Sequence, residues 1–253
     1  MANWNKIEIT LENGQKALAQ APVIVSASRS TDIPAFYCDW FFHRLKVGYS
    51  AWTNPFNGVK MYVSYAKTRF IVFWSKNPRP LLNHIDELKA RGIGCYVQYS
   101  LNDYEEEKLE RGVPPLAERI ETFKKLVDVL GKGSVIWRFD PLVLTEDITI
   151  EKLLNKIENI GDQLKGYTEK LVFSFVDILS YNKVKNNLKA NGISFVDWTE
   201  EQMAEFASRL VALNKEKGWN YKLATCGEKG RYPGVEPNHC IDDVLIIKKS
   251  FHD

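Results

Sequence analysis

Apolar and polar positions form long blocks along this chain, and four apolar runs each stop at a small polar cluster. The runs begin at Val23, Phe70, Val135 and Leu171, and the clusters that follow them end in proline or aspartate. Continuous apolar runs of this length are typical of strands buried on both faces in a parallel sheet. Charged groups have no reason to end a buried strand unless they reach an opening. In α/β folds this opening is the carboxyl edge of the sheet, so the pattern predicts where a site lies.

Strands and helices are predicted to alternate over the rest of the chain. Asn13-Gly14 lies between short alternating runs and predicts an N-terminal hairpin within residues 7–20. The charged stretch 103–112 is expected to form an exposed loop. Further strands are predicted at 49–53, 94–100, 221–225 and 244–247, a short extra strand at 61–65, and helices at 34–46, 79–91, 115–130, 149–164, 178–190 and 199–217.

This series predicts an α/β fold, a (β/α)8 TIM-type barrel that is complete or slightly irregular. We expect one domain over residues 1–253, with residues 1–21 as an N-terminal hairpin or extension, because no linker or repeat interrupts the series. An open doubly wound sheet is the main alternative. The chain has no Gly-x-Gly-x-x-Gly or Walker-type loop after the first strand, which weakens that alternative.

The composition of the chain limits its expected binding partners and its expected cellular compartment. The 34 basic and 32 acidic residues nearly cancel, so the net charge of +2 does not by itself favour duplex DNA, although a local basic patch is compatible with it. The N-terminus has no apolar leader segment, and no segment approaches the roughly 18 apolar residues of a membrane helix. The four cysteines include no short-spaced pair and are expected to be reduced. A cytoplasmic protein without membrane contact is predicted.

The polar residues at the strand ends are expected to gather on one face of the barrel and bind a small polar or anionic ligand. The candidate catalytic residues are Lys76, Asp140 and Asp32. The candidate ligand-binding residues are Ser28, Arg29, Ser30, Thr31, Asn54, Asn57, Asn77, Gln98, Arg138, Asp177 and Glu228. The same predicted face includes Ser75, Ser100, Asn102, Ser174 and Cys226.

Arg29 and Lys76 each precede a predicted helix, and each has alternative roles. Arg29 could bind a carboxylate or phosphate as a fork, or it could be paired nearby, while Thr31 or Asp32 caps the following helix. Lys76 follows an apolar run, where desolvation could prepare it for Schiff-base or general-base chemistry. An ion-pair or anion-binding role is favoured for Lys76, and a solvated lysine in the turn before Pro78 is the third reading.

Arg138 and Asp140 are two residues apart, so on a strand they share a face. They either pair with each other as a buried ion pair or face a ligand together, with Asp140 orienting Arg138. Metal binding is not predicted: Cys226 and Cys240 are weak candidates, because zinc sites need about four ligands at tight spacing. The aromatic residues fall mainly in the strands and the helix at 34–46, which favours core packing over a stacking platform.

The same segments resemble an uncharacterised bacterial family, the domain-of-unknown-function family 1848. Together they span about residues 23 to 247, and their combination and order are highly specific. The segments are Ile24-Val-Ser-Ala-Ser-Arg-Ser-Thr-Asp-Ile-Pro-Ala-Phe-Tyr37, Asn54-Pro-Phe-Asn57, Ile71-Val-Phe-Trp-Ser-Lys-Asn-Pro78, Val135-Ile-Trp-Arg-Phe-Asp-Pro141, and Cys226 with Cys240-Ile-Asp242.

The resemblance implies a barrel related to radical S-adenosylmethionine enzymes such as spore photoproduct lyase, with an iron–sulfur cluster and S-adenosylmethionine as cofactors. Typical members continue into a cysteine-rich tail, whereas this chain reads Lys-Lys-Ser-Phe-His-Asp after Ile247. A cluster needs three or four gathered thiolates, so its ligand cysteines are missing here. The tail has either been removed or been lost by this member.

These observations predict an enzyme that binds a small polar or anionic ligand at the strand ends, and by resemblance one related to radical S-adenosylmethionine enzymes. One alternative is a cluster-independent lyase or hydrolase that uses Lys76 or Asp140. The other is a non-catalytic module that binds nucleic acid or a protein partner.

Overall fold

The computed structural model describes residues 5–28, 31–54, 57–176, 185–186, 190, 192–227 and 232–250. The chain divides into two compact units. Unit 1 comprises residues 1–97 and 241–253, and unit 2 comprises residues 98–240. Unit 2 is therefore an insertion between two segments of unit 1. Its first and last residues are joined, because Gln98 Nε2 donates a hydrogen bond of 3.2 Å to the carbonyl oxygen of Cys240.

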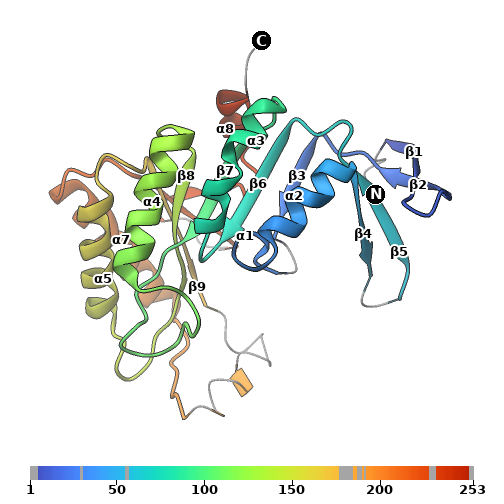
Figure 1. Cartoon of the computed structure of the whole chain (residues 1–253). Coiled ribbons are helices and arrows are strands. Elements are labelled where there is room, and N and C mark those ends of the chain that lie inside the picture. Colours follow the sequence, from blue (N-terminus) through green and yellow to red (C-terminus); the bar gives the residue numbers. More distant parts are fainter. Residues whose placement is uncertain are drawn as a thin grey trace. The chain divides into compact units, whose positions relative to one another are not determined.

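Unit 1 contains two groups of strands and several short helices (Figure 1). The apolar run that begins at Phe70 forms a strand whose first four residues are fully buried, as the sequence predicts. The elements are β1 (Lys6–Thr10), β2 (Lys16–Gln20), β3 (Ile24–Ala27), α1 (Ile33–Phe36), α2 (Cys38–Val47), β4 (Tyr49–Thr53), β5 (Lys60–Ser64), β6 (Phe70–Ser75), the 3-10 helix η1 (Arg79–Asn83), α3 (Ile85–Ala90), the start of β7 (Gly94–Ser100) and α8 (Asp243–Lys249).

A four-stranded sheet of unit 1 has the order β1-β2-β5-β4. β1 and β2 pair antiparallel, which confirms the predicted N-terminal hairpin. Asn13 Oδ1 accepts a hydrogen bond of 3.1 Å from the Gln15 amide, and Gly14 has a φ of 82°, a conformation that glycine adopts without strain. β4 pairs antiparallel with β5. The strand predicted at 49–53 therefore exists, but it belongs to this sheet and not to the predicted barrel.

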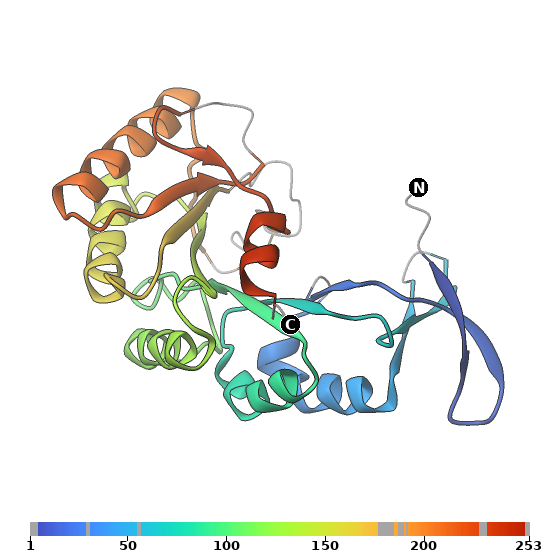
Figure 2. The same ribbon diagram turned by 90° about the horizontal axis from the view of Figure 1, so that it is seen from above.

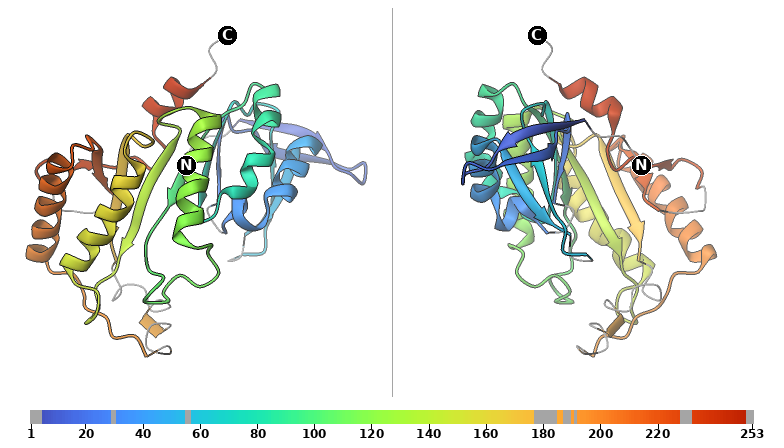
Figure 3. Two further views of the ribbon diagram at one scale, coloured as in Figure 1. Left: turned by 60° about the vertical axis from the view of Figure 1, so that its left-hand side comes forward. Right: turned by 90° about the vertical axis from the view of Figure 1, so that its right-hand side faces the viewer.

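Unit 2 contains the longest helices of the described chain. Its helices α4, α5 and α7 lie along the same face of the unit 2 strands (Figures 2 and 3). Phe206 of α7 meets Phe173 and Phe175 of one strand with ring centroids 5.8 and 5.7 Å apart. The elements are the end of β7, α4 (Leu116–Leu130), β8 (Val135–Leu142), α5 (Ile150–Leu164), β9 (Lys170–Phe175), α7 (Glu200–Glu216), β10 (Lys222–Thr225) and β11 (Glu236–Pro237).

A mostly parallel sheet has the strand order β11-β10-β9-β8-β7-β6-β3. The pairs β3–β6, β8–β9, β9–β10 and β10–β11 are all parallel. The four apolar runs are β3, β6, β8 and β9, which confirms that they are strands. The predicted closed (β/α)8 barrel is not confirmed: among the described strands, β3 and β11 end the order and do not pair with each other.

The strand predicted at 244–247 is wrong, because these residues lie in the helix α8. Asp242 caps this helix by accepting a hydrogen bond of 3.0 Å from the Leu245 amide, and Lys248 and Lys249 in the last turn suit the negative end of a helix. Only Ile246 of the apolar run is buried, while Val244 and Ile247 are exposed. A short apolar run that exposes some of its side chains fits a helix at the surface as well as it fits a strand.

The other helices follow their predictions more closely. The helices expected at 115–130, 149–164 and 199–217 are α4, α5 and α7, and Thr199 caps α7 in a capping box with Gln202. The helix expected at 34–46 is divided into α1 and α2 at Tyr37. Most of the helix expected at 178–190 lies outside the described residues. Within the described residues, no helix combines the length and the apolar character needed to cross a membrane.

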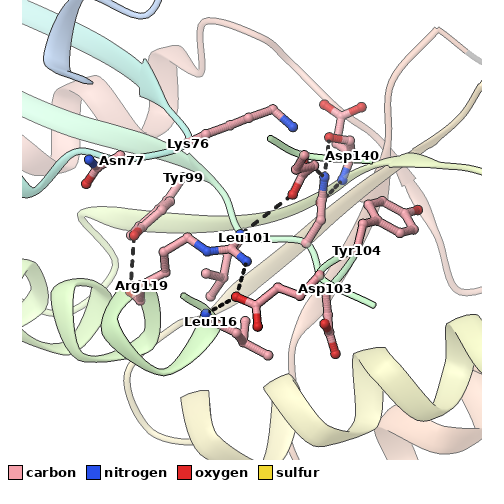
Figure 4. Close-up of polar contacts among 12 residues, drawn as sticks. Lys76, Asn77, Tyr99, Leu101, Asp103, Tyr104, Leu116, Arg119 and Asp140 are labelled. Carbon is pink, nitrogen blue, oxygen red and sulfur yellow. Dashed lines mark hydrogen bonds and ion pairs between the residues drawn. The ribbon is translucent and has the colours of Figure 1, made fainter. Parts of the chain in front are cut away.

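The sequence predicts an exposed loop at 103–112, but buried cations hold several of its acidic side chains. Arg119 of α4 has a side chain only 1% exposed, 3.6 Å from Glu105 and 3.7 Å from Glu110. Lys156 of α5 lies 3.8 Å from Asp103 and 3.3 Å from Glu107. Figure 4 shows Asp103 and Arg119 in this region. The loop is thereby fixed against two helices of unit 2.

Candidate functional site

Polar side chains of unit 2 gather at the carboxyl ends of its parallel strands. This is the edge at which the sequence predicts a site. Each side chain lies in the last part of a strand or directly after it. The group consists of Gln98 of β7, Arg138 and Asp140 of β8, Ser174 of β9, Cys226 after β10 and Asn238 after β11.

Strand register places this group on the face of the sheet opposite the α7 contact. Phe173 of β9 contacts α7, so Ser174, the next residue, points to the other face. Arg138 is in register with Val172, which has the same parity along β9 as Ser174. Cys226 follows Thr225, which is in register with Phe173. The alternation of the strands therefore directs Arg138, Ser174 and Cys226 to one face.

Arg138 and Asp140 form a close, two-point ion pair. Arg138 Nε and Nη2 donate to Asp140 Oδ2 at 3.1 and 2.5 Å. The Arg138 side chain is 4% exposed and that of Asp140 is 23% exposed. Paired charges with two hydrogen bonds are the strong form of this contact. The two side chains therefore pair with each other, which is one of the two arrangements considered from the sequence, and the carboxylate is the more exposed partner.

Two further contacts define the surroundings of the Arg138 guanidinium. Its Nη1 donates to Gln98 Oε1 at 3.1 Å, and its Nη2 lies 3.5 Å from Cys226 Sγ. Burial acts to lower the pKa of Arg138, but the charge of Asp140 and the contact with Cys226 outweigh it, so the pKa lies above its usual value. Arg138 therefore stays a cation within the site at every physiological pH.

The backbone of Asp140 is held as firmly as its side chain. Asn102 Oδ1 accepts a hydrogen bond of 2.8 Å from the Asp140 amide, and Asn102 Nδ2 donates to the Asp140 carbonyl at 3.1 Å. Tyr104 donates to the carbonyl of Pro141 at 2.8 Å and accepts from the Val143 amide at 3.0 Å. Burial raises the pKa of Tyr104 above its ordinary range, so this hydroxyl keeps its proton. Tyr104 and Asp140 are labelled in Figure 4.

The Asp140 carboxylate also accepts a hydrogen bond from the Ser174 hydroxyl, at its second oxygen. Cys226 is also partly exposed. Asn238 Nδ2 donates to Cys226 Sγ at 3.0 Å, in addition to the contact from Arg138. These two N–H donors hold the Cys226 sulfur in a fixed position. The arrangement thus presents a carboxylate and a thiol that are both held by hydrogen-bond donors.

The predicted site residues of unit 1 build turns and helix ends. Asp32 Oδ1 accepts from the Ala35 amide at 3.0 Å and caps α1, which confirms one of the two capping residues expected from the sequence. Asp32 Oδ2 accepts from the Lys76 amide at 2.8 Å. Ser28 Oγ accepts from the Ile33 amide at 3.2 Å. Asp32 thereby connects the segment after β3 to the segment after β6.

The remaining unit 1 candidates are in other turns or at the surface. The Asn77 amide donates to Ser75 Oγ at 2.9 Å, directly after β6. Asn54 and Asn57 form part of the connection between β4 and β5, where Asn57 Oδ1 accepts from the Val59 amide at 3.0 Å. Thr31 is exposed. Asn54 and Asn57 therefore belong to the four-stranded sheet, away from the strand-end edge on which the sequence places them.

Four predicted residues lie outside the described part of the chain: Arg29, Ser30, Asp177 and Glu228. Of the predicted ligand-binding set, the structure brings together Gln98 and Arg138 with Asp140. It adds Asn238, which sequence reasoning missed. No sequence pattern marks Asn238, because it follows a strand of only two residues.

The cysteines do not fit an iron–sulfur cluster. Cluster ligands are thiolates, and burial raises the pKa of both Cys38 and Cys95 to about 12. Cys226 and Cys240 belong to unit 2, and Cys38 and Cys95 to unit 1. Among the residues that the structure describes, no group of three or more histidine, cysteine, aspartate or glutamate side chains is arranged to hold a metal ion.

One comparison with known proteins gives a match. The model of a family described as "Domain of unknown function (DUF1848)" matches residues 24–252. No curated protein matches the chain. Because the family model covers most of the sequence, the chain belongs to this family, as its sequence motifs predict.

Proposed function

We propose that this member of the DUF1848 family is an enzyme that binds a small polar ligand at the carboxyl ends of β8, β9 and β10. Asp140 is the residue that contacts the ligand. One observation carries the proposal: buried partners hold both the backbone and the carboxylate of Asp140, while the carboxylate remains partly exposed. A fixed polar group of this kind is what binding and catalysis require.

The charges of the site favour a ligand with hydrogen-bond donors. Arg138 is compensated by Asp140, so the pair carries no net charge, and the more exposed partner is the acceptor. A carboxylate has about four lone-pair positions, and Asp140 uses three of them for the two Arg138 donors and Ser174. A hydroxyl or ammonium group fits the remaining capacity better than an anion does. Of the two ligand classes expected from the sequence, a polar ligand is therefore preferred over an anionic one.

Cys226 supports the enzymatic part of the proposal. A cysteine sulfur can act as the nucleophile of covalent catalysis where it is partly exposed and held in place by neighbouring groups. Cys226 is partly exposed, and Arg138 and Asn238 hold its sulfur. A ligand bound at Asp140 would lie beside this sulfur, since Arg138 contacts both groups.

A ligand screen by thermal unfolding tests the proposal. Polyols, amino sugars, amino acids and organic anions are added to the wild-type chain and to two variants, Asp140→Asn and Asp147→Asn. Asp147 is an exposed carboxylate of the same unit and serves as the matched control. A ligand at 100 times its dissociation constant stabilises the folded state by about 2.7 kcal/mol.

We expect a donor-bearing compound to raise the melting temperature of the wild type and of Asp147→Asn, but not of Asp140→Asn. The same compound is then followed by NMR in the presence of protein, where its conversion supports an enzyme. A stabilisation that survives in Asp140→Asn, or one produced only by organic anions, refutes the assignment of Asp140. Recovery of the bound compound unchanged refutes its role as a substrate.

A further inference from the structure

A pocket of about 490 Å³ lies in unit 1, and none of its lining residues belongs to the site around Asp140. It is bordered by the turn between β1 and β2, by α2 and by the strands β4 and β5. These elements are labelled in Figure 1. Pockets of roughly 300–1,000 Å³ are of the size that holds small ligands. The side chains that determine its chemistry are Glu12, Trp40, Arg44, Tyr49, Lys60 and Tyr62.

Aromatic rings form part of the pocket wall. Tyr49 and Tyr62 pack edge to face, with centroids 6.1 Å apart. Trp40 of α2 lines the same pocket and is 47% exposed, although the sequence predicts core packing for the aromatic residues of this helix. An exposed indole in a pocket offers a flat apolar surface to a ligand ring. Stacking on such a surface contributes about 1–3 kcal/mol for a nucleobase.

The charged side chains of the pocket differ in whether an opposite charge lies beside them. Arg44 is fixed within the wall: its Nε donates to the Tyr49 carbonyl at 2.9 Å, and its Nη1 donates to Glu12 at 3.0 Å. Its guanidinium also lies 4.6 Å from the centroid of the Tyr49 ring. Arg44 and Glu12 therefore compensate each other, and Glu12 remains largely exposed as an acceptor.

Lys60 provides a cation without this compensation. Its Nζ lies 5.5 Å from the centroid of the Tyr62 ring. Within the described part of the chain, no carboxylate comes within ion-pair distance of Lys60. An ammonium group in this position attracts an anion, and lysine is a common ligand for phosphate in proteins.

We propose that this pocket binds a small molecule that carries both an aromatic ring and a phosphate group, the chemistry of a nucleoside monophosphate. The ring lies against Trp40, the phosphate contacts Lys60, and Glu12 accepts a hydrogen bond from an amino or hydroxyl group. The volume accommodates one such molecule and exceeds what inorganic phosphate needs. A single nucleotide is favoured over a longer strand, because a pocket of about 490 Å³ has room for one such molecule.

Calorimetric titration of the full chain with AMP, adenosine and inorganic phosphate tests this proposal. AMP is expected to bind at least tenfold more tightly than either of the other two probes. Trp40→Ala and Lys60→Ala each weaken AMP binding at least tenfold, while Lys60→Arg keeps most of the affinity. Circular dichroism confirms that each variant is folded, and Trp40→Phe replaces Trp40→Ala if the latter is not.

The control variants are Trp52→Ala and Lys16→Ala. Trp52 is 42% exposed on β4, where alternation directs it away from the face that Tyr49 contributes to the pocket. Lys16 is an exposed lysine of β2 paired with Glu8. Both controls should bind AMP within twofold of the wild type. Absence of AMP binding at millimolar concentration, equal weakening by the controls, or much tighter binding of an oligoadenylate than of AMP each overturns the proposal.

Discussion

Replacing Arg138 by methionine tests whether the ion pair with Asp140 organises the candidate site. The substitution keeps an apolar side chain of similar length but removes two hydrogen bonds to Asp140, one to Gln98 and one to Cys226. The Asp140 carboxylate then loses the cation that compensates it. The fold must accommodate this charge without Arg138.

The expected cost follows from the burial of the two partners. Removing one member of a buried ion pair costs about 3–5 kcal/mol, because the other charge is left uncompensated. Arg138 is almost fully buried, but Asp140 is 23% exposed and regains some hydration. We therefore expect the lower end, about 3 kcal/mol. For a chain of this size the corresponding fall in melting temperature is roughly 6–12 °C.

Urea unfolding at pH 7 measures the loss, with Arg209→Met as the matched control. Arg209 lies on α7 in the same unit and makes exposed ion pairs with Glu151 and Glu205. Exposed pairs contribute about 0–1 kcal/mol each, so the control should lose far less stability than Arg138→Met. Equal losses in the two variants contradict the argument from burial.

A double-mutant cycle with Asp140→Asn separates the pair from other effects. Asp140→Asn leaves the guanidinium without its anion, and because Arg138 is almost fully buried we expect a loss of at least about 3 kcal/mol. Arg138→Met combined with Asp140→Asn should be at least about 1 kcal/mol more stable than the sum of the single losses predicts, because contacting residues are coupled. Losses that add within about 0.5 kcal/mol show that the two side chains do not stabilise each other.

Three further predictions concern groups with shifted pKa values. Burial acts to raise the pKa of Glu107, but hydrogen bonds from lysines outweigh it, so the pKa lies below 4.5. The charged carboxylate therefore stabilises the fold above pH 4.5, and this effect is lost as the pH falls. Glu107→Gln should lower the melting temperature at pH 7 and lower it less at pH 3. Burial raises the pKa of Asp103 above 3.8, so its charged form destabilises the fold as the pH rises. Asp103→Asn should therefore raise the melting temperature at pH 7 but not at pH 3. If Glu107→Gln and Asp103→Asn change the melting temperature in the same direction at pH 7, this reasoning is contradicted. Iodoacetamide at pH 8 should leave Cys38 and Cys95 unmodified in the folded chain while Cys240, which is exposed, reacts, as peptide mass spectrometry can measure; modification of all three at similar rates contradicts the assigned burial.

Local patterns predict much of the sheet and part of the site. The four buried runs are strands, because apolar side chains on both faces of a strand leave few alternatives. Arg138 and Asp140 are two residues apart on one strand, which is enough to predict that they share a face. Their pairing and the identity of the exposed partner depend on neighbouring strands and so require the structure.

Other features depend on contacts that no local pattern contains. Residues 49–53 form a strand as predicted, but only the pairing partner β5 assigns it to the four-stranded sheet. The apolar run at 244–247 is compatible with a strand or a helix, and the cap at Asp242 favours the helix. The proposed nucleotide pocket combines side chains from residues 11–15, from α2 and from two strands. Lys60 in this pocket has no sequence pattern that distinguishes it from other surface lysines.

The insertion of unit 2 into unit 1 has a consequence for the order in which the chain folds during synthesis. Unit 1 needs its second segment: the Asp242 amide donates to Tyr96 Oη at 3.1 Å, and α8 belongs to this unit. All of unit 2 is translated before that segment emerges from the ribosome. Unit 2 is continuous, and its ends meet at Gln98 and Cys240, so it can close first. Unit 1 is thus the first unit to be translated and the last to finish folding. Residues 1–97 remain incompletely packed until residues 241–253 have been synthesised.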